Sequence, residues 1–417
     1  MAQAKYTTHH GMTDILPGEV EKWQVLEELI RTEAKKYNFR EIRTPVLEQT
    51  DLIVRGIGQL TDIVSKEIFS FSRGDDHYVL RPECTAPVAR AFVENHLGQR
   101  GGIQKLFYIG PMFRAERPQK GRQRQFHQFG IEIMGSNDPV ADAETISFMM
   151  NIYRKIGISD TRLKINSVGD PESRDRYKNE LVDFFTPNRS RLSDLSQKRL
   201  DKNPLRILDS KEEEDRPFID EAPLISDYLN EESADHFQKV KEYLDDLGIP
   251  YETDPHLVRG LDYYTRTAFE LISPDLGSQD ALAGGGRYDL LVEEIGGPPT
   301  PAVGFAAGIE RLFIACDELD IDLALPDRAD VYIVTLGDAA RSWGITTLPA
   351  IREKGLTATM DYAGRSMKAQ MKDANRENAK YTIIVGDQEL EAGTFTFRDM
   401  EASKEESLTL DMILERL

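Results

Sequence analysis

Two strand-like runs joined by a short turn constrain the fold of this chain most strongly. Residues 105–116 (KLFYIGPMFRAE) and 124–135 (RQFHQFGIEIMG) are rich in aromatic and β-branched residues, and RPQKGRQ connects them. If the two runs pair as antiparallel strands, this connection is the tip of a hairpin that projects basic side chains. Because side chains alternate along a strand, the second run should place Gln128, Gly130 and Glu132 on one face. The opposite, apolar face should pack into the core through Phe129, Ile131 and Ile133. We expect the polar face to be open, with the glycine leaving room for a ligand.

The turn is basic, although the chain as a whole is acidic. Residues 113–132 hold five Lys or Arg and two carboxylates, whereas the chain has 72 Asp and Glu and a formal net charge of -20. A surplus of acid repels polyanions at long range, so a polyanionic ligand needs a local basic surface. Arg114 has the planar fork that grips a phosphate through two hydrogen bonds, and Phe126 offers a ring to a flat base. A solvated charged turn without a ligand is the alternative at this point.

The order of the other predicted elements indicates an α+β fold. The apolar spacing predicts a helix over 19–37, followed by a strand that ends at Pro45. Further strand-like pieces follow, with helices near 85–96 and 140–156, so strands and helices do not alternate strictly. We therefore expect a domain over residues 1–325 with an antiparallel sheet flanked by helices.

Two segments depart from this pattern. Residues 170–250 are charged and amphipathic, and we expect a helical insertion there. The acidic stretch around 320–330 is typical of a linker. Beyond it, three short β runs alternate with helical segments at 338–354 and 366–379. This alternation predicts a small α/β domain over 329–417 with a mainly parallel sheet.

Composition argues against several classes of protein. The chain has no run of eighteen apolar residues, and its first twenty residues lack the apolar core of a signal peptide, so we expect a cytoplasmic protein that binds no membrane. Cys84 and Cys316 are too few for a disulfide framework and lack the spacing of a metal site, so we predict no bound metal. The chain also lacks a GxxxxGK[ST] phosphate loop. A nucleotide would therefore have to bind on an arginine-lined sheet.

Three more stretches concentrate polar groups. LRPECTAP sets Glu83 and Thr85 on one side of an extended segment, where they suit an ammonium group. LVRGLDYYTRT gathers many hydrogen-bonding side chains around one glycine. AGIERL places Arg311 at the start of a helix, directly after a glycine-containing strand.

Together these stretches resemble the motifs of bacterial-type histidyl-tRNA synthetases, which are class II aminoacyl-tRNA synthetases, over essentially the whole chain. The helix and strand ending at Pro45, FRAERPQKGRQRQFHQFGIE and GFAAGIERL are similar to the three motifs of the class. LVRGLDYYTRT and AGGGRYD resemble two histidine-specific signatures. The resemblance implies a catalytic sheet of six or seven antiparallel strands, a helical insertion, a C-terminal anticodon-binding domain, and a homodimer formed partly through the first motif.

The resemblance also implies a ligand for each matching residue. ATP, arriving as its Mg²⁺ complex, would contact Arg114, Glu116, Arg122, Phe126 and Arg311. L-Histidine would contact Glu83, Thr85, Gln128, Glu132, Tyr263, Tyr264 and Tyr288. The acceptor end of tRNA(His) would contact Gln119 and Arg124. No tightly bound cofactor is implied.

Arg259 and Arg114 are the catalytic residues that the resemblance implies. Arg259 would bind both the substrate carboxylate and the α-phosphate, and Arg114 would hold the α-phosphate as well. Their fixed charge would stabilise the negative charge that grows on the phosphate oxygens. Glu132 and Tyr264 would bond the two imidazole nitrogens, and a substrate without a matching donor and acceptor would leave these buried groups unpaired.

Two other functions are alternatives to this reading. A regulatory paralogue that serves ATP phosphoribosyltransferase resembles the catalytic core but usually lacks the C-terminal domain, whereas this chain has residues 329–417. A plain nucleic-acid-binding module would not need Glu83, Gln128 and Glu132. We therefore favour ATP-dependent ligation of L-histidine to tRNA(His) through histidyl adenylate, with release of AMP and pyrophosphate.

Overall fold

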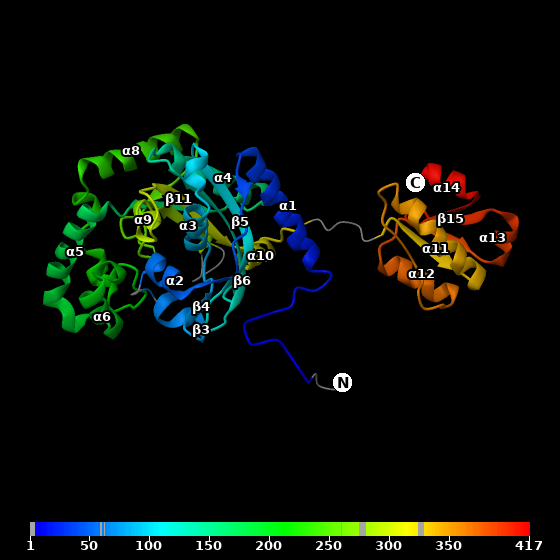
Figure 1. Ribbon diagram of the computed structural model, residues 1–417, viewed down its shortest axis with the longest axis horizontal. Helices are drawn as coiled ribbons and strands as arrows, with labels where there is room; N and C mark the ends of the chain where they lie inside the picture. Colours follow the sequence, from blue (N-terminus) through cyan, green and yellow to red (C-terminus); the bar gives the residue numbers. More distant parts are fainter. Residues whose placement is uncertain (1–4, 59–60, 62, 260, 275–280, 324–328) are drawn as a thin grey trace. The chain divides into compact units, whose positions relative to one another are not determined.

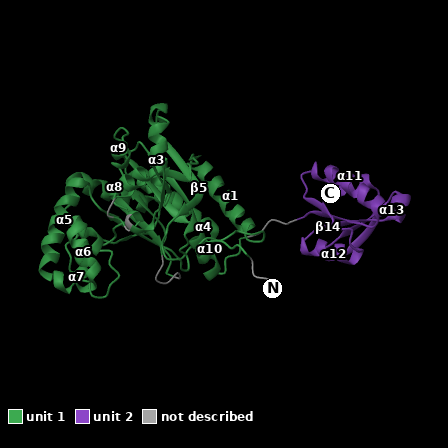
Figure 2. Ribbon diagram, turned by 60° about the horizontal axis from the view of Figure 1, so that its bottom comes forward, with its two compact units in different colours: residues 1–323 green, residues 324–417 purple. Residues whose placement is uncertain are grey.

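The chain forms two compact units, Met1–Leu323 and Ala324–Leu417 (Figures 1 and 2). The computed structural model describes the whole chain except residues 1–4, 59–60, 62, 260, 275–280 and 324–328. Among the residues described, no helix is both long enough and apolar enough to cross a membrane.

The first unit is built on an eight-stranded sheet in the order β1-β5-β6-β11-β10-β9-β7-β8. Its strands are β1 (Arg40–Glu41), β5 (Gln104–Phe113), β6 (Gln125–Met134), β7 (Arg162–Ser167), β8 (Glu252–Thr253), β9 (Thr265–Ile272), β10 (Ala281–Arg287) and β11 (Ala302–Gly308). The six inner strands pair antiparallel, and the two-residue edge strands β1 and β8 pair in parallel with β5 and β7. The predicted antiparallel sheet flanked by helices is confirmed, with short strands added at both edges.

Strands β5 and β6 form the hairpin that the sequence predicted. Gln128 lies opposite Gly110, and Glu132 lies opposite Leu106. Phe129 and Ile131 are fully buried in the core, together with apolar residues from four helices. These helices are α1 (Val20–Lys36), α4 (Val140–Ile156), α8 (Glu231–Asp246) and α10 (Ile309–Glu318). The predicted alternation of apolar and polar faces is therefore confirmed, but the polar face is not open along its whole length, because Glu132 is completely buried.

The strand predicted to end at Pro45 is shorter than expected, because β1 ends at Glu41. A second strand begins after Pro45 and pairs in a separate three-stranded sheet of order β2-β4-β3. Pro45, which cannot donate a ladder hydrogen bond, lies between the two strands. The elements here are β2 (Leu47–Gln49), α2 (Thr50–Ile57), β3 (Phe69–Arg73), β4 (Asp76–Leu80), α3 (Thr85–Glu94) and, later in the chain, α9 (Leu291–Glu294).

The segment predicted as a helical insertion is helical. It contains α5 (Pro171–Phe185), α6 (Asp194–Lys202), α7 (Arg216–Asp220) and α8. Tyr177, Leu181, Phe185 and Ile207 belong to an apolar core of its own. Helix α8 differs from the others because it packs on α4, β7 and β9 and contributes to the core beneath the sheet.

The second unit has a five-stranded sheet in the order β13-β12-β14-β15-β16. Its strands are β12 (Val331–Thr335), β13 (Ala358–Met360), β14 (Tyr381–Val385), β15 (Phe395–Asp399) and β16 (Lys404–Leu408), and its helices are α11 (Asp338–Arg352), α12 (Met367–Arg376), α13 (Asp387–Ala392) and α14 (Leu410–Arg416). The α/β class is confirmed, but the prediction of a mainly parallel sheet is wrong. Strand β15 runs antiparallel to both β14 and β16, so half of the four pairings are antiparallel. The sequence did not reveal the β15–β16 hairpin, because its turn has no glycine and most of β16 is exposed and polar.

Candidate active site

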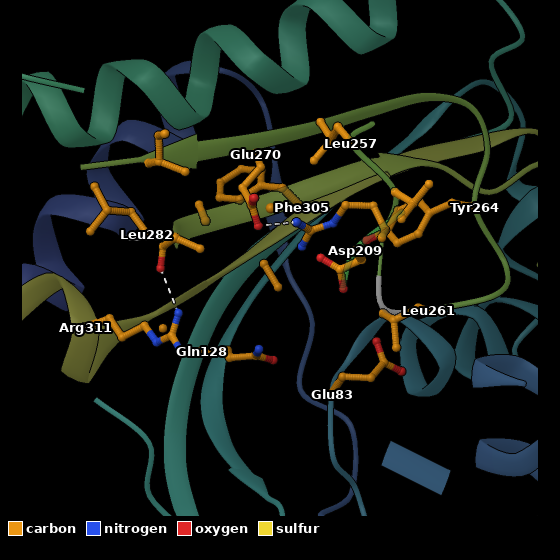
Figure 3. A pocket seen from close by; sticks show the side chains of 18 of the residues that line it. Glu83, Gln128, Asp209, Leu257, Leu261, Tyr264, Glu270, Leu282, Phe305 and Arg311 are labelled. Atoms are coloured by element: carbon orange, nitrogen blue, oxygen red, sulfur yellow. Dashed lines mark hydrogen bonds and ion pairs between the residues drawn. The ribbon is translucent and has the colours of Figure 1, made fainter. Parts of the chain in front are cut away.

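A pocket of about 760 Å³ opens on the polar face of the large sheet (Figure 3). Strands β6, β9, β10 and β11 contribute residues to it, and so do the start of α3 and the insertion. The predicted residues that line it are Glu83, Thr85, Arg114, Glu116, Arg122, Phe126, Gln128, Arg259, Tyr263, Tyr264, Tyr288 and Arg311. The fold therefore brings nearly all of the predicted site residues into one pocket, although they extend over more than 200 positions of the sequence, from Glu83 to Arg311.

Glu132 lies buried behind this lining with no exposed surface. Its Oε1 accepts a hydrogen bond from Thr85 Oγ1 at 2.8 Å, and its Oε2 accepts one from the Tyr288 hydroxyl. Burial raises the pKa of Glu132 to about 8, although the bonds from Tyr288 and Thr85 act to lower it. Glu132 is thus a carboxyl that holds its proton in the ligand-free site near neutral pH.

Glu83, which is predicted to bind the amino group of histidine, also has a structural role. Its two oxygens accept hydrogen bonds from the backbone N–H groups of Thr85 and Ala86 at 2.7 and 2.9 Å, at the first turn of α3. Burial raises the pKa of this carboxyl, while the two backbone bonds lower it. The neighbouring Gln128 has a buried Oε1 without a hydrogen-bond partner among the described residues. That orphaned acceptor in the pocket fits a ligand that donates hydrogen bonds, such as an ammonium group.

Three tyrosines cluster beside Glu132. The ring centroids of Tyr263 and Tyr264 are 4.7 Å apart, and those of Tyr263 and Tyr288 are 5.6 Å apart. The sequence prediction of an open space at Gly130 is wrong. A side chain there would meet the ring of Tyr108, which lies opposite on β5, so the glycine makes room for a protein side chain.

Arg259 lines the pocket and pairs with a carboxylate of β9. Its Nη1 donates to Glu270 Oε1 at 2.6 Å, and Figure 3 marks this bond. Burial alone would lower the pKa of Arg259, but the Glu270 charge holds it above its ordinary value. The Nε of Arg259 is buried without a partner in the described part of the chain. A Cβ at Gly284 would collide with the Arg259 guanidinium group, so a larger residue there would displace this group from its present position.

The other end of the pocket is basic. Arg114 donates to the Pro82 carbonyl at 3.0 Å, and its guanidinium carbon lies 5.2 Å from the centre of the Phe126 ring. Arg122 donates to Glu116 at 3.1 Å. Arg311 donates to the carbonyls of Gly121 and Ala281 at 3.2 and 2.8 Å. Burial lowers the pKa of Arg311, and the charges of Arg122 and Arg114 lower it further, so this end favours an anionic ligand.

Gln119 and Arg124 do not line the pocket. The turn of the hairpin is closed by mutual backbone hydrogen bonds between Gln119 and Arg122, at 3.0 and 2.9 Å. Arg124 bonds the carbonyls of Glu116 and His10 at 3.4 and 3.5 Å. Both residues lie in the hairpin outside the chamber, and their role toward tRNA stays a prediction.

Sequence reasoning missed two acidic residues that face the pocket. Glu270 is the one charged residue in the strand TRTAFELI after its first two positions. A partly buried arginine such as Arg259 needs a charged partner, and Glu270 provides it. A lone charge in an otherwise apolar strand could therefore have revealed this residue. Asp209 comes from the insertion, and burial raises its pKa against the charges of Arg206 and Arg199. Nothing in its sequence context indicates that the insertion reaches the sheet.

The pocket combines two kinds of binding group at its two ends. Buried carboxyls and phenols at one end suit a small molecule with its own donors and acceptors, and guanidinium groups at the other end suit phosphates. Arg259 lies among both sets of lining residues and can act on a reacting carboxylate and phosphate. A mainly antiparallel sheet bearing such a chamber is the arrangement of a class II aminoacyl-tRNA synthetase.

Comparisons with known proteins agree with this class. A family model described as histidyl-tRNA synthetase matches residues 11–312, and one described as an anticodon binding domain matches residues 330–417. The histidine–tRNA ligase of Halothermothrix orenii is 50% identical over 408 residues, which cover 98% of this chain and 97% of that protein. The histidine–tRNA ligase of Natranaerobius thermophilus is 47% identical over 409 residues, with the same coverage.

The solved structures include a similar chain. The crystal structure of apo histidyl-tRNA synthetase from S. aureus has a TM-score of 0.84 and 41% sequence identity, and it covers 99% of both chains. A Bacillus halodurans structure titled as an ATP phosphoribosyltransferase regulatory subunit/histidyl-tRNA synthetase has a TM-score of 0.66 at 24% identity, which shows a shared fold. The chain belongs to the histidyl-tRNA synthetase family.

Proposed function

We propose that this protein ligates L-histidine to tRNA(His) in two steps. Histidine and ATP first form histidyl adenylate and pyrophosphate, and the histidyl group then passes to the terminal ribose of the tRNA with release of AMP. Family membership and near-complete coverage of curated histidine–tRNA ligases support this function over that of the regulatory paralogue.

One observation carries the proposal for the site. Gln128 Oε1 and Arg259 Nε are both buried in the pocket without hydrogen-bond partners among the described residues. The first is an acceptor and the second a donor, so together they fit the ammonium and carboxylate groups of a free amino acid. Glu83 and Thr85, beside Gln128 in the pocket lining, complete the proposed amino-group site.

Selection of histidine would depend on the buried pair Glu132 and Tyr264. An imidazole ring offers one donor and one acceptor when neutral, and a carboxyl and a phenol can match both. Tyr288 donates a hydrogen bond to Glu132, and the tilted rings of Tyr263 and Tyr264 line the chamber. A substrate without this donor and acceptor would leave buried protein groups unpaired, at a cost of about 1–3 kcal/mol for each group.

Activation would occur at Arg259 and Arg114. The histidine carboxylate attacks the α-phosphorus of ATP, a carboxyl oxygen–phosphorus bond forms, and pyrophosphate leaves. Arg259 would bridge the carboxylate and the α-phosphate, and Arg114 would hold the α-phosphate, so fixed positive charge meets the charge that grows on the phosphate oxygens. Phe126 and Arg311 would enclose adenine, while Glu116 and Arg122 would position the base and outer phosphates.

Mg²⁺ would enter with ATP as part of the substrate complex. The described residues contain no group of three or more His, Cys, Asp or Glu that could hold a metal ion by themselves. Phosphate oxygens would therefore supply much of its coordination.

The tRNA would contact both units. We propose that residues 1–325 form the catalytic domain with an insertion near 170–250, and that residues 329–417 bind the anticodon, in agreement with the anticodon-binding family model over 330–417. Gln119 and Arg124 would meet the acceptor end. We also propose that the protein is cytoplasmic and forms a homodimer. Sedimentation of the purified protein would test the dimer.

Charging of tRNA tests the full reaction. The purified protein, ATP, Mg²⁺ and labelled histidine should convert tRNA(His) to its histidyl form and leave a tRNA for another amino acid uncharged. If histidine-dependent pyrophosphate release occurs without any charging, the second step of the proposal fails.

A further inference from the structure

The insertion is joined to the histidine-specific loop by hydrogen bonds that the proposed reaction does not use. This loop, residues 257–264 without the undescribed Gly260, carries Arg259, Tyr263 and Tyr264 into the pocket. It lies outside the helices and strands, so its backbone carbonyls have no ladder partners. Buried carbonyls must find other donors, and here several come from the insertion.

Arg174 of helix α5 is the central donor. Its Nη1 donates to the Asp262 carbonyl at 3.1 Å, and its Nη2 donates to the Tyr264 carbonyl at 2.5 Å. The two nitrogens of one planar fork thus hold two carbonyls on either side of Tyr263. A guanidinium group can make this double contact, whereas a lysine ammonium is a compact point charge that cannot span both carbonyls in the same way.

Two further insertion residues support the same loop. Asn203 Nδ2 donates to the Asp262 carboxylate at 3.2 Å, and Arg206 Nη1 lies 3.4 Å from the Arg259 carbonyl oxygen. On its other side, the loop is held by the N–H of Asp262, which donates to the Ile57 carbonyl at the end of α2 at 3.1 Å. Val258 packs against the apolar core of the insertion. The loop is therefore clamped between α2 and the insertion.

The start of helix α5, which carries Arg174, is capped. Asp170 caps the start of α5 by accepting a hydrogen bond from the Ser173 N–H at 2.9 Å, and it also accepts one from Asn230 at 2.9 Å. Arg174 is the residue after Ser173, in the first turns of the same helix. Hydrogen bonds therefore hold the first turn of α5, from which Arg174 reaches the loop.

We propose that Arg174, assisted by Asn203 and Arg206, is a positioning residue that sets the geometry of Arg259 and the tyrosine pair. The inference rests on the proposed function. The insertion is then a working part of the amino-acid activation site, because the arginine that acts on the reacting groups belongs to a backbone that the insertion holds. A displacement of about 1 Å in such a group can reduce a rate about 100-fold.

The test compares Arg174→Lys and Arg174→Met with Arg176→Lys. Arg176 is on the same helix and donates to the Tyr228 carbonyl inside the insertion, so it is a matched control that does not touch the loop. We measure histidine-dependent exchange of labelled pyrophosphate into ATP, with kcat and the KM for histidine separated, and the unfolding temperature of each variant. Both Arg174 variants should lower kcat by about tenfold or more, which corresponds to about 1.4 kcal/mol. The control should stay within twofold, and Arg174→Lys should unfold within a few degrees of the control.

Combination with Arg259→Lys tests whether Arg174 acts through Arg259. If it does, adding Arg174→Lys to Arg259→Lys should cost much less than it costs in the wild type, because the group it positions is already impaired. Fully additive losses would contradict the inference, and so would Arg174 variants within twofold of the wild type. Absence of exchange by the wild-type protein would refute the proposed function itself, which separates the two failures.

Discussion

The two ends of the pocket solve different problems with different degrees of burial. At the predicted histidine end, Glu83, Glu132 and Tyr288 are almost completely buried, and desolvation raises the pKa of each. At the predicted ATP end, Arg122 keeps 42% of its side-chain surface exposed, and Arg114 lies partly open beside Phe126. This difference indicates that selection of an amino-acid side chain needs a buried site, whereas neutralisation of phosphate charge can occur in a partly exposed one.

Burial makes an unpaired polar group costly, so the closed end can reject a wrong side chain. Fixed positive charge needs little burial to attract phosphates, so the open end can admit a large, hydrated nucleotide. Arg259 shares features of both ends, because it is charged, partly buried and paired with Glu270. Changes at the closed end should affect histidine, and changes at the open end should affect ATP.

The largest expected effect is that of Arg259→Ala. It should lower histidine-dependent pyrophosphate exchange by about 1,000-fold, because it removes the charge that meets the reacting carboxylate and phosphate together. The fold should persist, as judged by an unfolding temperature near that of the wild type. Near-normal exchange would show that neither end depends on this residue.

Glu132→Gln comes next and acts on the closed end alone. Gln keeps the size of the side chain and resembles the protonated carboxyl, but it cannot release a proton when an imidazole binds, so the KM for histidine should rise by about 100-fold through mispaired buried contacts. The KM for ATP should change by less than twofold. Exchange kinetics at varied histidine and ATP measure both, and an unchanged KM for histidine would contradict the recognition scheme.

Arg122→Gln is the matching change at the open end. Loss of one hydrogen bond to a charged phosphate should raise the KM for ATP by about tenfold, with the KM for histidine within twofold. The wild-type KM for ATP should also rise with salt more steeply than that of the variant. Equal changes in both KM values would remove the distinction between the two ends.

Arg124→Ala should have a smaller effect outside the pocket. Because Arg124 lies in the hairpin beyond the chamber, the variant should charge tRNA(His) several-fold more slowly while pyrophosphate exchange stays within twofold. Charging and exchange measured on the same preparation decide this. A parallel loss in both assays would place Arg124 in the activation site instead.

The smallest effect concerns stability in the absence of ligands. A carboxyl whose pKa rises from its ordinary 4.5 to about 8 keeps its proton in the folded protein and loses it in the unfolded chain. Between these values the folded state binds more protons, so rising pH should lower the unfolding temperature by a few degrees. Glu132→Gln should weaken this slope, since Gln does not titrate. Thermal unfolding from about pH 5 to pH 8 measures it, and identical slopes would argue against a buried neutral Glu132.

The parts of the fold that follow from local periodicity were predictable. The alternation in β6 correctly placed Phe129 in the core and Gln128 in the pocket, and the helix at 140–156 matches α4. The hairpin was predictable because two strand-like runs follow each other closely, although β5 ends at Phe113 and β6 begins at Gln125, so the connection is longer than predicted. The β15–β16 hairpin was missed because no turn signal marks it and its outer strand is polar.

Long-range contacts were not predictable from the residues alone. Gly130 could indicate room for a ligand or for a protein side chain, and the position of Tyr108 on the neighbouring strand decides between them. The pairing of Arg259 with Glu270 depends on how the loop packs on β9, and the contact of Arg174 with the loop depends on how the insertion packs against it. Resemblance to a family suggested the roles of the site residues, and these roles stay predictions; the structure shows that most of these residues line one pocket.

The most direct measurement is exchange of labelled pyrophosphate into ATP, with each of the twenty amino acids in turn and without tRNA. The account predicts exchange with histidine alone, since only its side chain matches the buried donor and acceptor at the closed end of the pocket. Exchange with another amino acid, or none with any amino acid from well-folded protein, would contradict it.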